Sequence, residues 1–275
     1  MTFIAVCMKW VSALPEINPL SGEVRLPNAR FGGISAADQA ALEVALQLGA
    51  QRSMPVAVFS VGANQSEPSL YAALAAGAQR AIRIDSGPEV SSADTARVLA
   101  LTLSDASYVL CGDYSFDRGS GSVPAYLAAE LGITQALGVV SLTPQTHDIL
   151  VTRRLDGGRR EHLRITDRAV ISVEGSIARL RRASLATSLA TREVRIQVIP
   201  STISTHQVTS IIKPFRPRPR TIAQPQGDTA LQRFHSITNV ATASTRGEQI
   251  ELTSVKSAMY ILQTLGHWGY IEQKH

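Results

Sequence analysis

The residues best suited to chemistry lie in a glycine- and serine-rich segment that runs into a stretch with helical spacing. Glycines allow a backbone to approach an anion closely, and the N–H groups and dipole of a helix start favour negative charge. Hydroxyl groups can donate hydrogen bonds as well. The segment therefore predicts a phosphate-binding loop for a nucleotide, with an ordinary entry loop to a helix as an equal alternative. Its relevant members are Gly112, Asp117, Gly119, Ser120, Gly121, Ser122 and Val123.

Several motifs that would indicate a catalytic site do not occur in the sequence. It contains no G-x-x-x-x-G-K-[ST], no G-x-G-x-x-G after the first expected strand and no G-x-S-x-G. No paired carboxylates or histidine group suggest acid–base chemistry. Cys7 and Cys111 lie in apolar runs, which indicates buried free thiols, and no C-x-x-C or histidine spacing suggests a metal site. We therefore expect a nucleotide-binding fold with no catalytic residues and no metal.

The charge balance leaves two kinds of partner to consider. The net charge of +5 is compatible with nucleic-acid binding or with a basic surface that meets an acidic protein or an anionic nucleotide. We favour the second because no basic stripe interleaved with aromatic residues accompanies the charge. The first apolar run is too short for a signal peptide, and no run of about 18 apolar residues occurs. We expect a cytoplasmic protein with no nucleic-acid partner and no membrane insertion.

Strand-like and helix-like segments alternate through the first half of the chain. This alternation predicts βαβ units, a parallel sheet and helices on both of its faces. Ser35 is expected to cap the first helix together with Asp38, and Gly49 to end it. The expected strands are Phe3–Cys7, Val56–Val61, Ala81–Ile84 and Tyr108–Cys111, and the expected helices are Ala37–Leu48, Leu70–Ala76, Ala93–Leu103 and Val123–Leu131.

The pattern changes in the second half. Two apolar segments, Leu150–Leu155 and His162–Ile165, flank Asp156-Gly157-Gly158 and predict a β-hairpin, and Ala169–Val173 predicts another buried strand. The proline-rich segment Lys213–Gly227 predicts an extended arm, and Val255–Leu265 an amphipathic helix. Such an arm and helix either embrace a partner or fold back on their own domain, and the sequence supports both equally. An earlier segment, Gly22–Asn28, is expected to be hairpin-like.

Four segments resemble the β subunits of electron-transfer flavoproteins, in the same order and over roughly residues 1–200. They are Ile4–Val11, Ser35–Leu48, Asp117–Leu131 and Val151–Ser172, the last of which contains the Asp-Gly-Gly turn. The resemblance implies a Rossmann-like (adenine nucleotide hydrolase-like) α/β fold with a β-hairpin insertion. It also implies two parts: a nucleotide-binding domain over residues 1–200, and an arm and helix over residues 201–275 that clasp a larger α subunit.

The resemblance further implies how the cofactors are shared. FAD would be held mainly by the α subunit, and this subunit would bind AMP. Ser35-Ala36 replaces an Asn-Pro pair of the family and Val123-Pro124-Ala125 replaces Thr-Gly-Gln, so AMP, FAD and an empty site stay open. By matching position, the nucleotide contacts would be Cys7, Ser35, Ala36, Asp38, Val61, Gly112, Asp117, Gly119, Ser120, Gly121, Ser122 and Val123.

A short basic segment, Arg181–Ala186, resembles the family's partner-recognition loop. The resemblance implies that Leu185, beside Arg181 and Arg182, docks into a flavin-dependent dehydrogenase; a core leucine is the equal alternative. The chain would then be the small subunit of a heterodimeric electron carrier, not an enzyme, that passes electrons towards a quinone-linked oxidoreductase. A stand-alone adenine-nucleotide-binding regulatory or stress-type protein is the alternative, although it explains neither the hairpin nor the arm.

Overall fold

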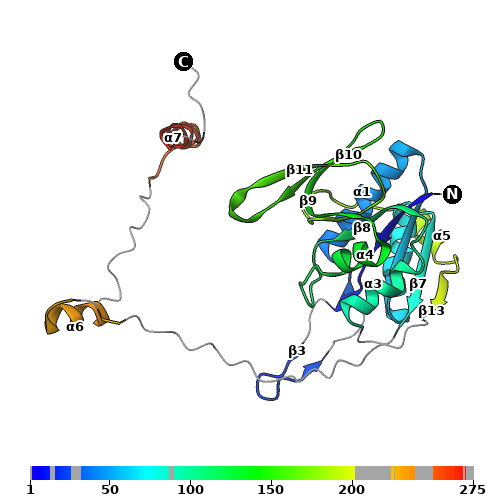
Figure 1. Ribbon diagram of the computed structural model, residues 1–275, viewed down its shortest axis with the longest axis horizontal. Helices are drawn as coiled ribbons and strands as arrows, with labels where there is room; N and C mark the ends of the chain where they lie inside the picture. The colour runs from blue at the N-terminus through cyan, green and yellow to red at the C-terminus, as the bar shows by residue number, and fades with distance from the viewer. Residues whose placement is uncertain are drawn as a thin grey trace. The chain divides into compact units, whose positions relative to one another are not determined.

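The computed structural model describes residues 2–12, 16–25, 32–86, 90–201, 224–225, 227–238, 250–268 and 270. Its chain divides into two units, residues 1–215 and 216–275, and each is described by itself. The first unit is built on a nine-stranded sheet (Figure 1). In spatial order the strands are β11 (Arg160–Ile165), β10 (Ile149–Arg154), β9 (Thr134–Pro144), β12 (Ala169–Val173), β8 (Ala106–Gly112), β1 (Phe3–Cys7), β6 (Val56–Val61), β7 (Arg80–Asp85) and β13 (Gln197–Pro200).

The strand order reverses beside β1. This strand pairs in parallel with β6 on one side and with β8 on the other. The chain first passes outward through β6 and β7, which are parallel, and then returns to form β8 and β12, which are also parallel. The switch in strand order therefore lies between β1 and β8, where an open α/β sheet places its ligands. These pairings confirm the expected Rossmann-like fold.

Helices cover both faces of the sheet. The face that carries Ile4 and Val6 packs against α1 (Ala36–Arg52) and α2 (Glu67–Ala76). The opposite face, which carries Ala5 and Cys7, packs against α3 (Ser92–Ala100) and α4 (Val123–Leu131). Successive side chains of a strand point to opposite faces, so an uninterrupted apolar strand serves both layers. The remaining helical segments of this unit are η2 (Asn64–Ser66), η3 (Asp156–Gly158) and α5 (Leu185–Thr191).

The first helix begins as expected but ends later. Ser35 caps α1, since its hydroxyl oxygen accepts a hydrogen bond from the Asp38 N–H at 3.0 Å. The prediction that Gly49 ends the helix is wrong, because α1 continues to Arg52 and closes at Ser53, whose φ is 52°. A Cβ added at Gly49 would lie 2.8 Å from the Met54 carbonyl oxygen, so this glycine serves close packing.

A hairpin extends the sheet beyond its parallel part. The long strand β9 pairs in parallel with β12 through its first half and antiparallel with β10 through its second. Gly138, with φ 69°, lies between the two halves, and its N–H donates to the Ser172 hydroxyl at 3.0 Å. The expected β10–β11 hairpin is confirmed, with Gly157 and Gly158 of η3 both at positive φ in its turn.

Two small ribbons follow β1. Strand β2 (Val11–Ser12) pairs with β5 (Gly32–Gly33), and β3 (Glu16–Ile17) pairs with β4 (Val24–Arg25). The hairpin expected at residues 22–28 thus overlaps the end of the β3–β4 ribbon, although residues 26–28 lie outside the described part of the chain.

The second unit contains two described helices, α6 (Ala230–Thr238) and α7 (Ser254–His267). The expected C-terminal helix is confirmed as part of α7. The expected proline-rich arm falls almost entirely on residues outside the described ranges, since only residues 224, 225 and 227 of it are included. Across the described residues, the structure has no helix with the length and hydropathy that crossing a membrane would need.

Replacement of Gly49 by alanine should destabilise the protein although alanine is the better helix former. The new methyl group would press against the Met54 backbone, and such overpacking costs about 1–3 kcal/mol. Gly33→Ala is the matched control, because a Cβ there meets nothing within 4 Å, and it should change stability by less than about 0.5 kcal/mol. Urea unfolding of the wild-type protein and both variants checks this prediction. A Gly49→Ala variant as stable as the wild-type protein would contradict it.

Candidate functional site

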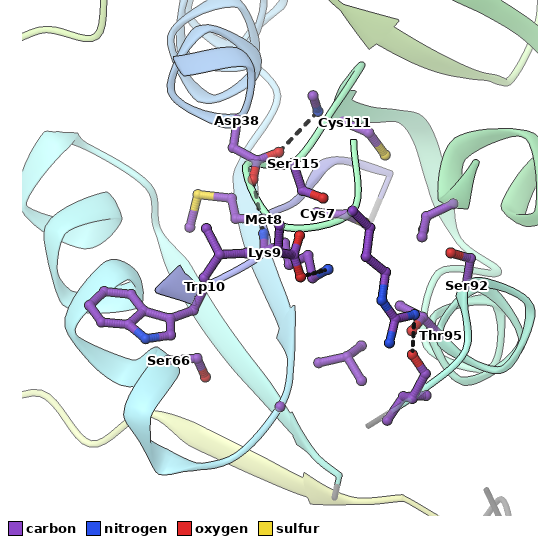
Figure 2. Close-up of a pocket in the computed structure, with 18 of the residues that line it drawn as sticks. Cys7, Met8, Lys9, Trp10, Asp38, Ser66, Ser92, Thr95, Cys111 and Ser115 are labelled. Atoms are coloured by element: carbon purple, nitrogen blue, oxygen red, sulfur yellow. Dashed lines mark hydrogen bonds and ion pairs between the residues drawn. The ribbon is translucent and has the colours of Figure 1, made fainter. Parts of the chain in front are cut away.

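A cavity of about 820 Å³ opens at the carboxyl ends of the central strands, beside the switch in strand order (Figure 2). Its walls come from β1, β6, β8, the start of α3 and the loop between β8 and α4. Three of the expected nucleotide contacts, Ser35, Ala36 and Gly119, are not part of this lining. The other residues expected to contact a nucleotide are brought together here: Cys7, Asp38, Val61, Gly112, Asp117, Ser120, Gly121, Ser122 and Val123.

Asp38 joins the two strands that diverge at the switch point. One carboxylate oxygen accepts the Lys9 N–H at 3.0 Å, just beyond β1, and the other accepts the Gly112 N–H at 3.2 Å, at the end of β8. Burial raises the pKa of Asp38 from its ordinary value of 3.8 to about 7, although both backbone hydrogen bonds oppose the shift. A single carboxyl group therefore fixes the spacing of the strand ends that form the cavity floor.

Glycines let the start of α1 reach these strand ends. A Cβ added at Gly112 would lie 2.6 Å from an Asp38 carboxylate oxygen and 2.8 Å from the Asp38 nitrogen. One added at Gly175, just after β12, would lie 3.1 Å from Ala36. Side chains at either position would push the helix away from the sheet. The glycine at position 112 therefore has a packing role in addition to lining the cavity.

The loop between β8 and α4 has the backbone that its glycines predict. Gly119 and Gly121 both adopt positive φ, at 62° and 55°, and a Cβ on Gly121 would lie 2.0 Å from the Asp113 carbonyl oxygen. The hydroxyl oxygens of Ser120 and Ser122 lie 3.1 Å apart. Ser122 makes no side-chain cap to α4, so its side chain does not compete for the first N–H groups of that helix. Pro124 has no N–H, so the N–H groups of Val123 and Ala125 are the ones at this helix start that can face an anion.

Two cationic side chains at the cavity were not among the predicted site residues. The Lys9 ammonium group lies 2.6 Å from an Asp117 carboxylate oxygen, and the Arg118 guanidinium donates to the Val90 carbonyl at 3.1 Å. Burial would raise the pKa of Asp117, but hydrogen bonds from Lys9, Ser115 and the Arg118 N–H, together with the Lys9 charge, outweigh it and lower that pKa. The position of Lys9 two residues after a strand end was the sequence signal that could have identified it.

Aromatic residues also line the cavity and were missed by the sequence analysis. The Tyr114 and Phe116 rings meet edge to face with their centroids 5.9 Å apart. Trp10 lines another part of the wall, where a Cβ on Gly32 would lie 2.3 Å from its indole. These rings supply flat apolar surface next to the cationic groups, as a site for a heterocyclic anion needs.

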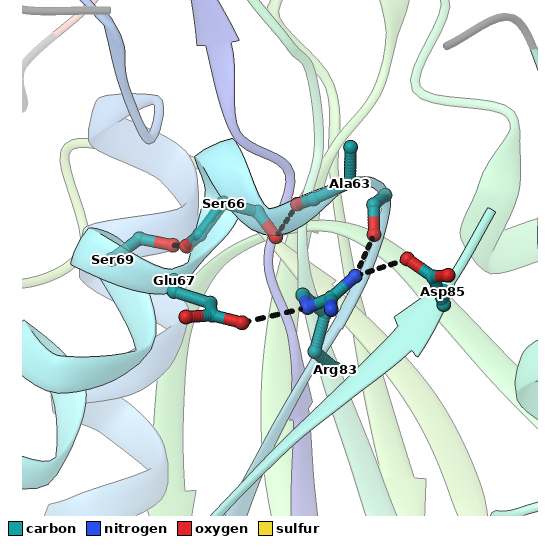
Figure 3. Close-up of polar contacts among 7 residues, drawn as sticks. Ala63, Ser66, Glu67, Ser69, Arg83 and Asp85 are labelled. Atoms are coloured by element: carbon teal, nitrogen blue, oxygen red, sulfur yellow. Dashed lines mark hydrogen bonds and ion pairs between the residues drawn. The ribbon is translucent and has the colours of Figure 1, made fainter. Parts of the chain in front are cut away.

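A buried arginine fixes the wall formed by the turn after β6 (Figure 3). The Arg83 side chain donates to the Gly62 carbonyl at 3.0 Å and to the Glu67 carboxylate at 3.0 Å, and it also pairs with Asp85. The turn is further closed by the Ser66 hydroxyl, which donates to the Ala63 carbonyl at 2.9 Å. Since Gly62, Ala63 and Ser66 line the cavity, Arg83 holds one wall from behind.

The residues expected to dock a partner lie apart from the cavity lining. Leu185 is the first residue of α5 and is 76% exposed, so the alternative of a core leucine is wrong. Arg181 pairs through two of its guanidinium nitrogens, Nε and Nη2, with the buried Glu43 of α1, at 2.9 and 2.8 Å, and its backbone N–H also donates to that carboxylate. Arg181 therefore anchors the segment, while Arg182 is exposed.

Among the described residues no group of three or more histidine, cysteine, aspartate or glutamate side chains could hold a metal ion.

The raised pKa of Asp38 predicts a pH dependence of stability. Between about pH 4 and 7 the folded state keeps a proton that the unfolded chain has already released, so the stability that this proton contributes is lost as the pH rises through this range to 7. Relative to Asp38→Asn, the wild-type protein should lose on the order of 2 kcal/mol of unfolding free energy from about pH 5 to about pH 8. Denaturant titrations of both proteins at about pH 5 and about pH 8 check this prediction. If the difference in unfolding free energy between wild type and Asp38→Asn is the same at both pH values, the N–H donors keep Asp38 ionised.

Comparison with known proteins agrees with this geometry. The family model for the electron transfer flavoprotein domain matches residues 28–203. An electron transfer flavoprotein β subunit from Bradyrhizobium diazoefficiens is 28% identical over 165 residues, 59% of this chain and 66% of that protein. The β subunit from Methylophilus methylotrophus is 30% identical over 156 residues, 54% of this chain and 59% of that protein.

These two alignments thus leave a third or more of each relative unmatched. A third relative, protein FixA from Sinorhizobium fredii, is 28% identical over 282 residues, which cover 92% of this chain and 98% of that protein. The family model alone covers more than half of the 275 residues. The chain therefore belongs to the electron transfer flavoprotein family, among its β-subunit members.

Proposed function

We propose that this chain is the smaller subunit of a heterodimeric electron carrier and that its cavity holds an adenine nucleotide. The observation that carries the proposal is the position of the cavity, at the strand-order switch between β1 and β8. The cavity combines a glycine-rich loop, an uncapped helix start and two cationic side chains in one place. This combination suits a phosphate, and the neighbouring apolar wall suits a base.

The residues present fit AMP as the resident ligand of this subunit. The close backbone approach at Gly121 and the hydroxyls of Ser120 and Ser122 would receive the phosphate, with Lys9 supplying positive charge. FAD would lie mainly in the partner, where it supplies the electron-carrying chemistry. The work of this chain is then to position its nucleotide and to complete the surroundings of the partner's flavin.

A carrier role is favoured over catalysis by the state of the titratable groups. Asp38 is held by two backbone N–H groups, and Asp117 is held by Lys9. Both carboxyl groups therefore serve to join segments of the cavity, Asp38 through backbone donors and Asp117 through a charged side chain. We therefore infer that the described residues orient ligands rather than make or break bonds.

The second unit supports a partner of the α-subunit type. Val255, Met259 and Leu262 of α7 are exposed, and their spacing of four and three residues places them on one helical face. In α6, Leu231 and Phe234 are exposed as well. Apolar helix faces of this kind are typical of surfaces that another protein covers. We propose that residues 201–275 clasp the larger subunit.

Co-expression with a candidate α-type chain tests the proposal as a whole. We expect a yellow heterodimer, FAD released on denaturation, and AMP as a second released nucleotide, each identified by liquid chromatography and mass spectrometry. A colourless homodimer that binds ATP would instead favour the stand-alone regulatory protein.

The loop glycines give a sharper test of the nucleotide site. Gly121→Ala should remove most of the bound AMP, because its methyl group would lie 2.0 Å from the Asp113 carbonyl oxygen and force the loop to move. Gly119→Ala is the matched control: it also has positive φ, but the nearest atom to its Cβ is 3.9 Å away. Nucleotide content per heterodimer checks this; equal retention in both variants would contradict the assignment.

We further propose that Leu185 docks into a flavin-dependent dehydrogenase and that the complex delivers electrons to a quinone-linked oxidoreductase. Leu185→Ala should slow dehydrogenase-coupled flavin reduction without changing flavin content, because it removes an exposed apolar anchor. Leu189→Ala, on the same helix and also exposed, is the control and should have a smaller effect. The measurement is the rate of flavin reduction as a function of dehydrogenase concentration. An unchanged rate for Leu185→Ala would overturn the docking role.

A further inference from the structure

The only two cysteines of the chain are direct neighbours in the sheet. Cys7 ends β1, Cys111 lies near the end of β8, and the two are register partners in the parallel pairing of these strands. Register partners point to the same face, and both cysteines belong to the core layer beneath α3 and α4. Their thiol groups therefore lie side by side although 104 positions, 111 minus 7, separate them in the sequence.

Both thiols can be reached from the cavity. Cys7 and Cys111 are 8% and 4% exposed, and both belong to the cavity lining (Figure 2). A hydrogen bond with Cys7 and burial together raise the pKa of Cys111, so the Cys111 thiol is protonated at rest. The cavity floor thus carries two adjacent thiol groups, and the contact predicted between Cys7 and a nucleotide would not require both of them.

The spacing favours a bridge through a third atom over a direct disulfide. Parallel strands lie about 4.8 Å apart, and the Cβ atoms of register partners are separated by a similar distance. A disulfide needs its Cβ atoms about 3.8 Å apart, so direct oxidation would require the strands to move closer. An inserted atom that bonds both sulfurs removes this requirement, and soft ions and electrophiles are the partners that thiolate sulfur prefers.

We propose that Cys7 and Cys111 form a two-sulfur site for soft, thiophilic electrophiles in the floor of the cavity. With phenylarsine oxide as the probe, each thiol forms one arsenic–sulfur bond, and the two thiol protons leave with the oxide oxygen as one water molecule. Arsenic stays trivalent, so no oxidant or reductant is needed. The site does not depend on which nucleotide the cavity holds, and it concerns this chain's residues alone.

The test uses the full chain, with any subunit that co-purifies, treated with phenylarsine oxide and freed of excess reagent. Intact mass spectrometry resolves this chain and reports its adducts. We expect one arsenical per chain that survives 2-mercaptoethanol but is removed by dithiothreitol, because only a dithiol competes with a two-sulfur site. Since the chain has no other cysteine, an adduct of this kind is assigned to the pair.

Cys7→Ser and Cys111→Ser are the matched variants, and each should lose the arsenical in 2-mercaptoethanol because only one sulfur remains. Circular dichroism establishes that the variants are folded. The wild-type measurement decides the proposal even if a variant fails to fold. Loss of the wild-type adduct in 2-mercaptoethanol, or its retention by a folded single variant, would overturn the two-sulfur site.

Discussion

The structure depends on the contact between the first turn of α1 and the ends of β1 and β8. Asp38 accepts an N–H from each strand end, and Gly112 leaves the space that this approach needs. A buried carboxyl group is costly unless hydrogen-bonded, so the two backbone donors and a hydrogen bond from the Ser35 side chain make its position tolerable. Because the sheet diverges at this point, the same contact sets the width of the cavity floor.

The cavity walls are fixed by charged groups that lie partly behind them. Arg83 binds the Gly62 carbonyl and two carboxylates, and thereby holds the turn after β6. On the other side, the ion pair of Lys9 and Asp117 joins the end of β1 to the loop before α4. Both side chains are partly exposed, so water screens the pair and it contributes little stabilising free energy. We infer that the β6 wall is the firmer of the two, and that the β8–α4 loop adjusts to a ligand.

Much of the fold could be predicted because its sequence patterns are local. Apolar runs and glycines locate the parallel strands and their helices, and Ser35 with Asp38 marks the start of α1. The edge strand β13 and the long strand β9 were not predicted, since both are half exposed and are strands only through their neighbours. In the site, the loop glycines were found from sequence, but Arg118 was not, because its contact with Val90 joins distant segments.

Helix α1 holds three regions of the first unit in place. Its first turn holds the cavity floor through Asp38, its middle holds the segment before α5 through Glu43 and Arg181, and its end holds the β9–β10 turn through Arg52. The Arg52 guanidinium also lies over the Tyr108 ring of β8, which ties that end of the helix back to the sheet. A shift of this helix relative to the sheet would break contacts at all three places at once. The proposed nucleotide site and the proposed docking segment are therefore held at a fixed spacing by one helix rather than by loops.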